Sequence, residues 1–122
     1  MKIVSAANAM IVTRDRITEV TPAAQGSEIF FLYDCKYKWS ITKTDTADYG
    51  LFFYPGTQTL QELAAWPDNA WYEFNEMIRY STLDLGTKEA KDTFAELYRV
   101  VSENLFGINS VLDEIIDNAD WM

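Results

Sequence analysis

Apolar and polar residues alternate along the first half of the chain with the period of two that is typical of β-strands. The clearest case is 36–43, where Tyr37, Trp39 and Ile41 share one face and lysine, serine and threonine share the other. Proline, glycine and aspartate separate similar segments that are rich in β-branched and aromatic residues. We therefore expect strands at 10–13, 16–20, 28–33, 36–43 and 51–54, turns at 14–15 and 34–35, and a loop at 21–27.

After Gly56 the apolar positions take the three- and four-residue spacing of helices. Thr59 and Glu62 have the spacing of a capping box, which predicts a helix that begins at Thr59 and that Pro67 ends or kinks. Asp68 could cap a second helix. The apolar side of this second helix is expected to consist of Trp71, Phe74, Met77 and Ile78.

A third helix is predicted from Thr87, after a connection at 83–86. Its apolar residues recur every three or four positions: Ala90, Phe94, Leu97, Val101, Leu105, Ile108, Leu112, Ile115 and Ala119. Gly107 lies inside this stripe, and Ser110 with Asp113 could begin a new helix. The pattern therefore allows either one bent helix or two helices.

Strands that come first and helices that come afterwards predict an α+β fold. Because links of hairpin length cannot make parallel crossovers, we expect an N-terminal, mainly antiparallel sheet of about four or five strands. Two to four helices should follow and pack on one sheet face. The chain would form a single domain, 1–122, with a sheet half at 1–57 and a helical half at 58–122.

Charge divides the two halves. The first holds six basic and six acidic residues, whereas the second holds four basic and thirteen acidic residues and therefore the whole net charge of −9. Neither lysine nor arginine follows Arg99. The acidic residues form two groups at helical spacing: Asp113, Asp117 and Asp120 with Glu114 beside them, and Glu89, Asp92 and Glu96.

These carboxylates are the first candidate site. Like charges at this spacing destabilise a helix slightly, so their presence suggests a use. On a rigid helix they could present phosphate-like charge to the basic surface of a nucleic-acid-handling protein. A solvated face that keeps the protein soluble and a metal site are the alternatives, although the spacing lacks the loop and central glycine of a calcium hand. At a pI near 4.3 we expect direct binding neither to nucleic acid nor to a membrane.

Aromatic residues form the second candidate site. Tyr37 and Trp39 could line a ligand pocket between sheet and helices, or they could simply fill the core. Trp66 and Trp71 flank Pro67, where one ring could be an exposed anchor for a partner.

Catalytic chemistry has little support in the sequence. The chain has no histidine and one cysteine, Cys35, so the common zinc and haem ligand sets are absent, as is the usual base for a serine or cysteine nucleophile. We assign no catalytic residue, metal ligand or cofactor. Neither a signal peptide nor a transmembrane helix is predicted, so we expect a cytoplasmic protein.

Small size, one-sided negative charge and the missing catalytic motifs favour a non-enzymatic inhibitor or adaptor that blocks a basic nucleic-acid-binding surface. Phage-type anti-defence proteins, such as anti-CRISPR and anti-restriction proteins, share this character, although no family motif links them to this chain. One alternative is a module that binds a nucleotide-like small molecule, for which Arg79, Lys88, Lys91 and Arg99 would have to converge on the aromatic pocket. The other is a homo-oligomeric structural component in which the long apolar stripe packs against a second copy.

Overall fold

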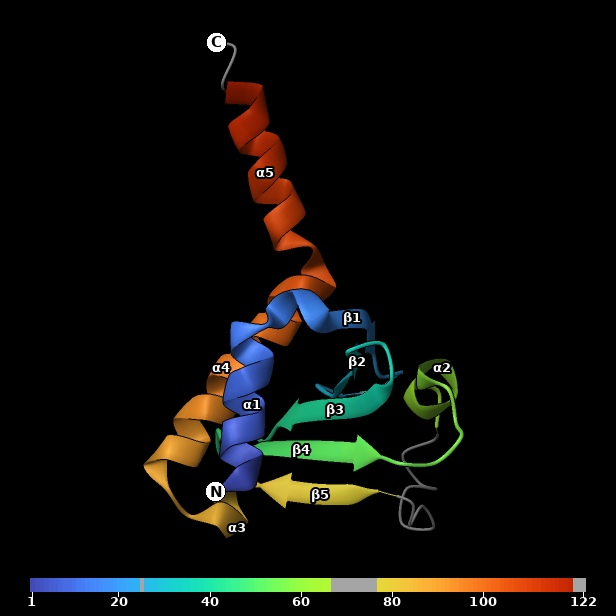
Figure 1. The fold of residues 1–122 in the computed structure, drawn as a ribbon, viewed down its shortest axis with the longest axis vertical. Coiled ribbons are helices and arrows are strands. Elements are labelled where there is room, and N and C mark those ends of the chain that lie inside the picture. Colours follow the sequence, from blue (N-terminus) through green and yellow to red (C-terminus); the bar gives the residue numbers. More distant parts are fainter. Residues whose placement is uncertain (25, 67–76, 120–122) are drawn as a thin grey trace.

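A computed structural model describes residues 1–24, 26–66 and 77–119 of the chain. Five strands form one antiparallel sheet in the order β1-β2-β3-β4-β5 (Figure 1). They are β1 (Ile17–Pro22), β2 (Ile29–Tyr33), β3 (Tyr37–Lys43), β4 (Tyr49–Tyr54) and β5 (Ile78–Ser81). The helices are α1 (Lys2–Val12), the single 3-10 turn η1 (Arg14–Arg16), α2 (Leu60–Ala64), α3 (Thr82–Leu85), α4 (Lys88–Phe106) and α5 (Ile108–Ala119). The predicted α+β class and antiparallel sheet are confirmed.

Strand β3 has the alternation that its sequence predicts. In the register with β2, Trp39 lies opposite Phe31 and Ile41 opposite Ile29, which puts these apolar side chains on one sheet face. A turn at Asp34 and Cys35 joins the two strands, and both residues have positive φ angles, 57° and 60°. The turn predicted at 34–35 is therefore confirmed.

The first element is a helix, and the strand predicted at 10–13 is wrong. Ile3, Ala7 and Met10 are buried at helical spacing along α1, and the alanine-rich sequence between them favours a helix. The run Met10-Ile11-Val12 has the composition of a strand, but its β-branched residues occupy only the last turn of this helix. Tertiary packing and the preceding alanines together override that local preference.

Ile78 lies in a strand, so the helix predicted to contain it is wrong at this end. In β5, apolar and polar residues alternate, and Ile78 pairs with Phe53 at the edge of β4. The sheet therefore continues beyond 51–54, and the sequence-based prediction of 51–54 as the last strand is wrong. Met77, also predicted in that helix, lies in neither a helix nor a strand. Asp68, Trp71 and Phe74, and the boundary at Pro67, lie outside the described residues.

Helices cover both faces of the sheet. Helices α1 and α4 lie side by side on one face (Figure 1), where Met10 and Phe94 pack with Phe31 in the larger core. The short α2 packs on the opposite face, where Leu63 joins Phe30 in a smaller core. Of the helices that follow the strands, α4 packs on one face and α2 on the other, so the expectation that they all pack on one face is wrong.

Capping residues set the limits of the helices in the second half. The Thr59 hydroxyl accepts a hydrogen bond from the backbone N–H of Glu62, at 3.1 Å, and the Thr87 hydroxyl accepts one from Ala90, also at 3.1 Å. Gly107, with φ of 64°, ends α4 in the left-handed conformation and separates it from α5. The two-helix alternative is therefore the one observed. Among the described residues, no helix has the length and hydropathy needed to cross a membrane.

Candidate functional site

Helix α5 projects from the end of α4 and away from the sheet (Figure 1). Every described side chain from Ser110 to Ala119 is exposed. In α4, by contrast, the first part of the apolar stripe, including Phe94 and Leu97, is fully buried. The apolar stripe from Ala90 to Ala119 is therefore divided at Gly107 into a buried part in α4 and an exposed part in α5.

The apolar side of α5 is open over its whole described length. The exposed fractions are 45% for Val111, 48% for Leu112, 59% for Ile115 and 57% for Ile116. Residues three and four apart lie together on a helix surface, so these four side chains form one continuous face. Large apolar residues grouped in this way are unusual on a monomer surface and are typical of interaction sites. We call this set of four residues the α5 apolar face.

Three of the predicted acidic residues, Asp113, Glu114 and Asp117, lie on the remaining side of α5 and are exposed. Asp113 is three residues before Ile116, and Glu114 is three residues after Val111, so each carboxylate borders the apolar face. Asp117 lies between them at the middle of the polar side. No lysine or arginine occurs in α5, so all of its side-chain charge is negative. Asp120 lies outside the described residues.

The acidic residues of α4 do not join this group. Glu89 and Asp92 are exposed near the start of α4, and at 1.5 Å per residue the 19 residues of this helix extend about 28 Å before α5 begins. Glu96 is paired with Arg99, which also pairs with Glu103. The hydrogen bond from Arg99 lowers the pKa of Glu96, and both carboxylates raise the pKa of Arg99. The predicted acidic residues therefore form two separate exposed groups, one near the start of α4 and one on α5. Between them, Arg99 neutralises part of the charge of Glu96 and Glu103.

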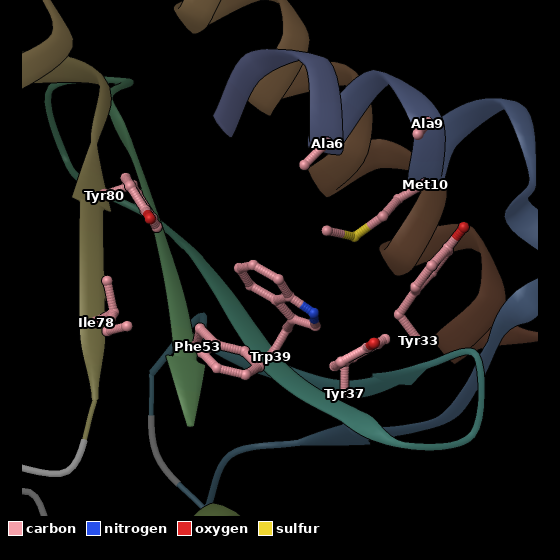
Figure 2. Close-up of a pocket in the computed structure, with 9 residues that line it drawn as sticks. All are labelled: Ala6, Ala9, Met10, Tyr33, Tyr37, Trp39, Phe53, Ile78 and Tyr80. Carbon is pink, nitrogen blue, oxygen red and sulfur yellow. The ribbon is translucent and has the colours of Figure 1, made fainter. Parts of the chain in front are cut away.

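A cavity of about 370 Å³ lies between α1 and the sheet (Figure 2). Its lining comes from α1 and from four strands: Ala6, Ala9, Met10, Tyr33, Tyr37, Trp39, Phe53, Ile78 and Tyr80. We call it the α1–sheet pocket. Tyr37 and Trp39, which the sequence singled out, both lie in it. Trp66 is instead packed against the smaller core on the opposite face, and Trp71 lies outside the described residues.

The walls of the α1–sheet pocket are apolar and mainly aromatic. The ring of Phe53 is tilted against Trp39, with centroids 5.0 Å apart, and against Tyr37, with centroids 6.4 Å apart. The hydroxyl of Tyr33 is held by Thr13 Oγ1 at 2.8 Å. Trp39 Nε1 is buried without a hydrogen-bond partner among the described residues, which costs about 1–3 kcal/mol for such a donor.

None of the four cations that a nucleotide-like ligand would need lines this pocket. Arg79 alternates with Ile78 and Tyr80 along β5 and therefore points to the other sheet face. Lys88 and Lys91 line a separate hollow at the start of α4. Arg99 is engaged by its two glutamates. The pocket is therefore suited to uncharged molecules.

A polar cluster that the sequence did not reveal connects β2, β3 and β4. Ser40 Oγ donates a hydrogen bond to Glu28 Oε2 at 2.6 Å, and the Tyr54 hydroxyl lies 2.7 Å from Ser40 Oγ and 3.4 Å from the same carboxylate. Burial, together with the nearby charge of Glu28, raises the pKa of Tyr54. Ser40 has no exposed surface, so a substrate cannot reach its hydroxyl. The cluster satisfies buried polar groups.

In the described ranges 1–24, 26–66 and 77–119, no three acidic or cysteine side chains converge to form a metal site. No protein-family model, curated protein or solved structure matches this chain at a significant level.

Proposed function

We propose that this protein is a non-enzymatic adaptor or inhibitor that docks α5 onto a basic surface of a nucleic-acid-handling protein. The observation that supports this most is the projection of α5 away from the sheet (Figure 1). The apolar face and the carboxylates of this helix are exposed together. The inhibitor would act by occupying the surface that the partner otherwise offers to nucleic acid. A phage-type anti-defence role, against a restriction or CRISPR system, belongs to the same proposal. So does a cytoplasmic location.

The apolar face would supply most of the affinity. An amphipathic helix binds a partner by laying its apolar side chains into a groove, at the spacing seen for Val111, Leu112 and Ile115. Burial of large side chains in such a groove stabilises a complex by roughly 25 cal/mol per Å² of apolar surface, before the costs of association are subtracted. The exposed leucine and isoleucine residues are therefore the expected anchors.

The carboxylates would supply the specificity for a basic partner. Asp113 and Glu114 border the apolar face on its two sides, where they would meet lysine or arginine at the rims of the groove. Such rim charges accelerate association and exclude acidic partners more than they add affinity. Because exposed charges are screened by salt, binding should weaken as ionic strength rises.

The experiment is affinity capture from host lysate at about 50 mM and 500 mM salt, conditions that differ strongly in charge screening. The chain, the double variant Asp113→Lys/Asp117→Lys and a control with the same charge change, Asp15→Lys/Asp45→Lys, are compared. Asp15 and Asp45 are exposed in the sheet half. We expect a nucleic-acid-binding protein to be captured by the chain and by the control, to be lost with the α5 variant, and to be released by salt or duplex DNA.

Equal capture by the α5 variant and the control would contradict the proposal. So would capture that duplex DNA does not displace, because the partner's nucleic-acid surface would then still be open.

Self-association is the second candidate, and the exposed α5 apolar face favours it as well. Two copies could bury these faces against each other with their carboxylates outward. Sedimentation of the chain over a hundredfold range of concentration distinguishes a monomer from this dimer.

A further inference from the structure

The α1–sheet pocket exists because α1 has small side chains where it faces this part of the sheet. On this helix Ile3, Val4 and Met10 are buried in the larger core, while the small residues Ala6 and Ala9 face the aromatic side chains of the sheet (Figure 2). The pocket is open to solvent, since Ala9, Tyr37 and Ile78 of its lining are exposed, so a ligand can enter it without unfolding the protein. A cavity of about 370 Å³ lies within the size range of small-molecule sites.

The side chains that line the pocket indicate which class of small molecule it could bind. All nine lining residues are uncharged, and five of them are aromatic. A charged ligand would lose its hydration without gaining a charged partner, which is strongly unfavourable. Lys36, which does not line the pocket, is engaged by the Tyr37 ring, with its Nζ 4.8 Å from the ring centroid. Flat apolar molecules, in contrast, can stack on Trp39 and Phe53.

A few polar groups are available to orient such a ligand. The hydroxyls of Tyr37 and Tyr80 make no hydrogen bond with the described part of the chain, so both can donate to a ligand and accept from it. Figure 2 shows the indole nitrogen of Trp39 on the side of the ring that faces Met10 and Tyr33. Its buried N–H has no partner among the described residues, and the flexible Met10 side chain is the neighbour that could move to expose it.

We propose that the α1–sheet pocket binds an uncharged small molecule with a flat, mainly apolar ring system and one or two hydrogen-bonding atoms. This pocket is separate from α5, so a ligand can bind in it whether or not α5 docks on a partner. It differs from a nucleotide site because no phosphate-binding cation lines it.

Binding is tested with Nile red, an uncharged planar dye whose emission increases in apolar surroundings, and with indole as its competitor. The pocket-filling variant Ala6→Leu/Ala9→Leu keeps good helix formers in α1 and puts bulk where the ligand would lie. The matched control is Asn8→Leu, which adds the same side chain to an exposed position of α1 outside the lining. Circular dichroism establishes that each variant is folded.

We expect saturable dye binding that indole displaces, at least a tenfold loss of affinity in the pocket-filling variant, and no loss in Asn8→Leu. Indole-3-acetate, which adds a carboxylate, should compete at least tenfold more weakly than indole. Tyr37→Ser gives a second variant if the double substitution fails to fold, since this side chain is 41% exposed and its removal leaves no buried hole.

Unchanged affinity in both pocket variants would overturn the proposal, as would equal competition by the charged and uncharged indoles. Loss of dye binding in Leu112→Glu, with the pocket intact, would instead place the dye on the α5 apolar face and also contradict it.

Discussion

At the scale of single residues, the polar cluster of Glu28, Ser40 and Tyr54 is the most consequential feature that the strand pattern hides. Ser40 occurs on the side of β3 that alternation marks as polar, yet it is fully buried because α2 covers that face near it. A buried hydroxyl is tolerated when it is hydrogen-bonded, and the carboxylate of Glu28 provides that bond. The cluster therefore ties three strands together beneath α2.

Removal of the Tyr54 hydroxyl should destabilise the fold. Tyr54→Phe loses the contacts to Ser40 and Glu28 but keeps the ring, which packs 5.8 Å from Phe30. We expect the free energy of unfolding to fall by about 1–2 kcal/mol at neutral pH. Chemical denaturation measures it, with the exposed Tyr37→Phe as the control. An unchanged midpoint would mean that the hydroxyl is not a structural partner.

The same residue predicts how stability depends on pH. Because the pKa of Tyr54 is raised in the folded protein above its ordinary value of 10.0, the folded state retains this proton where the unfolded state loses it. The contribution is fully present below pH 10 and decreases as the pH rises above it. The free energy of unfolding should therefore decline less steeply above pH 10 in Tyr54→Phe than in the unchanged chain. Equal slopes would contradict the assignment.

At the scale of elements, Gly107 decides whether the last two helices continue or separate. Its φ of 64° is the left-handed conformation that ends α4, and an added Cβ would meet no atom within 4 Å. Gly107→Ala should therefore destabilise through backbone strain alone, by about 1 kcal/mol. Chemical denaturation measures the loss, and Gly26→Ala, at another open position with positive φ, shows the cost of the same change in a loop. A stabilised Gly107→Ala variant would indicate that α4 and α5 prefer to form one helix.

Local signals predicted some elements and missed others for physical reasons. The caps at Thr59 and Thr87 depend on side chain to backbone bonds within three residues, so the sequence alone reveals them. Helix α1 and strand β5 depend on distant partners: α1 is stabilised by packing on α4, and β5 by pairing with the edge of β4. For the same reason, the pocket could not be predicted in full, because Tyr37 and Trp39 meet Ala6 and Ala9 only in the tertiary fold.

Substitutions in the α5 apolar face should abolish partner binding without unfolding the protein. Leu112→Glu/Ile115→Glu replaces two half-exposed side chains, so the free energy of unfolding should change by no more than about 1 kcal/mol. Capture of the partner should be lost. The control is Leu97→Ala, a fully buried position in α4, which should lower stability by about 2–5 kcal/mol and retain binding in the folded fraction. A large loss of stability in the α5 variant would show that this face packs on the protein itself.

At the scale of the whole molecule, the domain body and helix α5 differ in how they treat apolar and charged side chains. The domain body has one apolar core on each face of the sheet, and its Arg99 is paired with two glutamates. Its exposed large apolar side chains, such as Val12 and Leu83, lie on different helices. In α5, by contrast, four large apolar side chains and three carboxylates are exposed together on one helix. Because the two cores stabilise the domain, α5 can remain exposed while the rest of the protein stays folded.

If α5 docks by its apolar face and is guided by its carboxylates, its affinity for the captured partner must depend on salt through those carboxylates. The dissociation constant is measured between about 50 mM and 500 mM salt for the chain, Asp113→Lys/Asp117→Lys and the Asp15→Lys/Asp45→Lys control. Affinity should fall with salt for the chain and the control, and the α5 variant should bind at least tenfold more weakly with little remaining salt dependence. The same affinity and the same salt dependence in all three proteins would contradict this mode of docking.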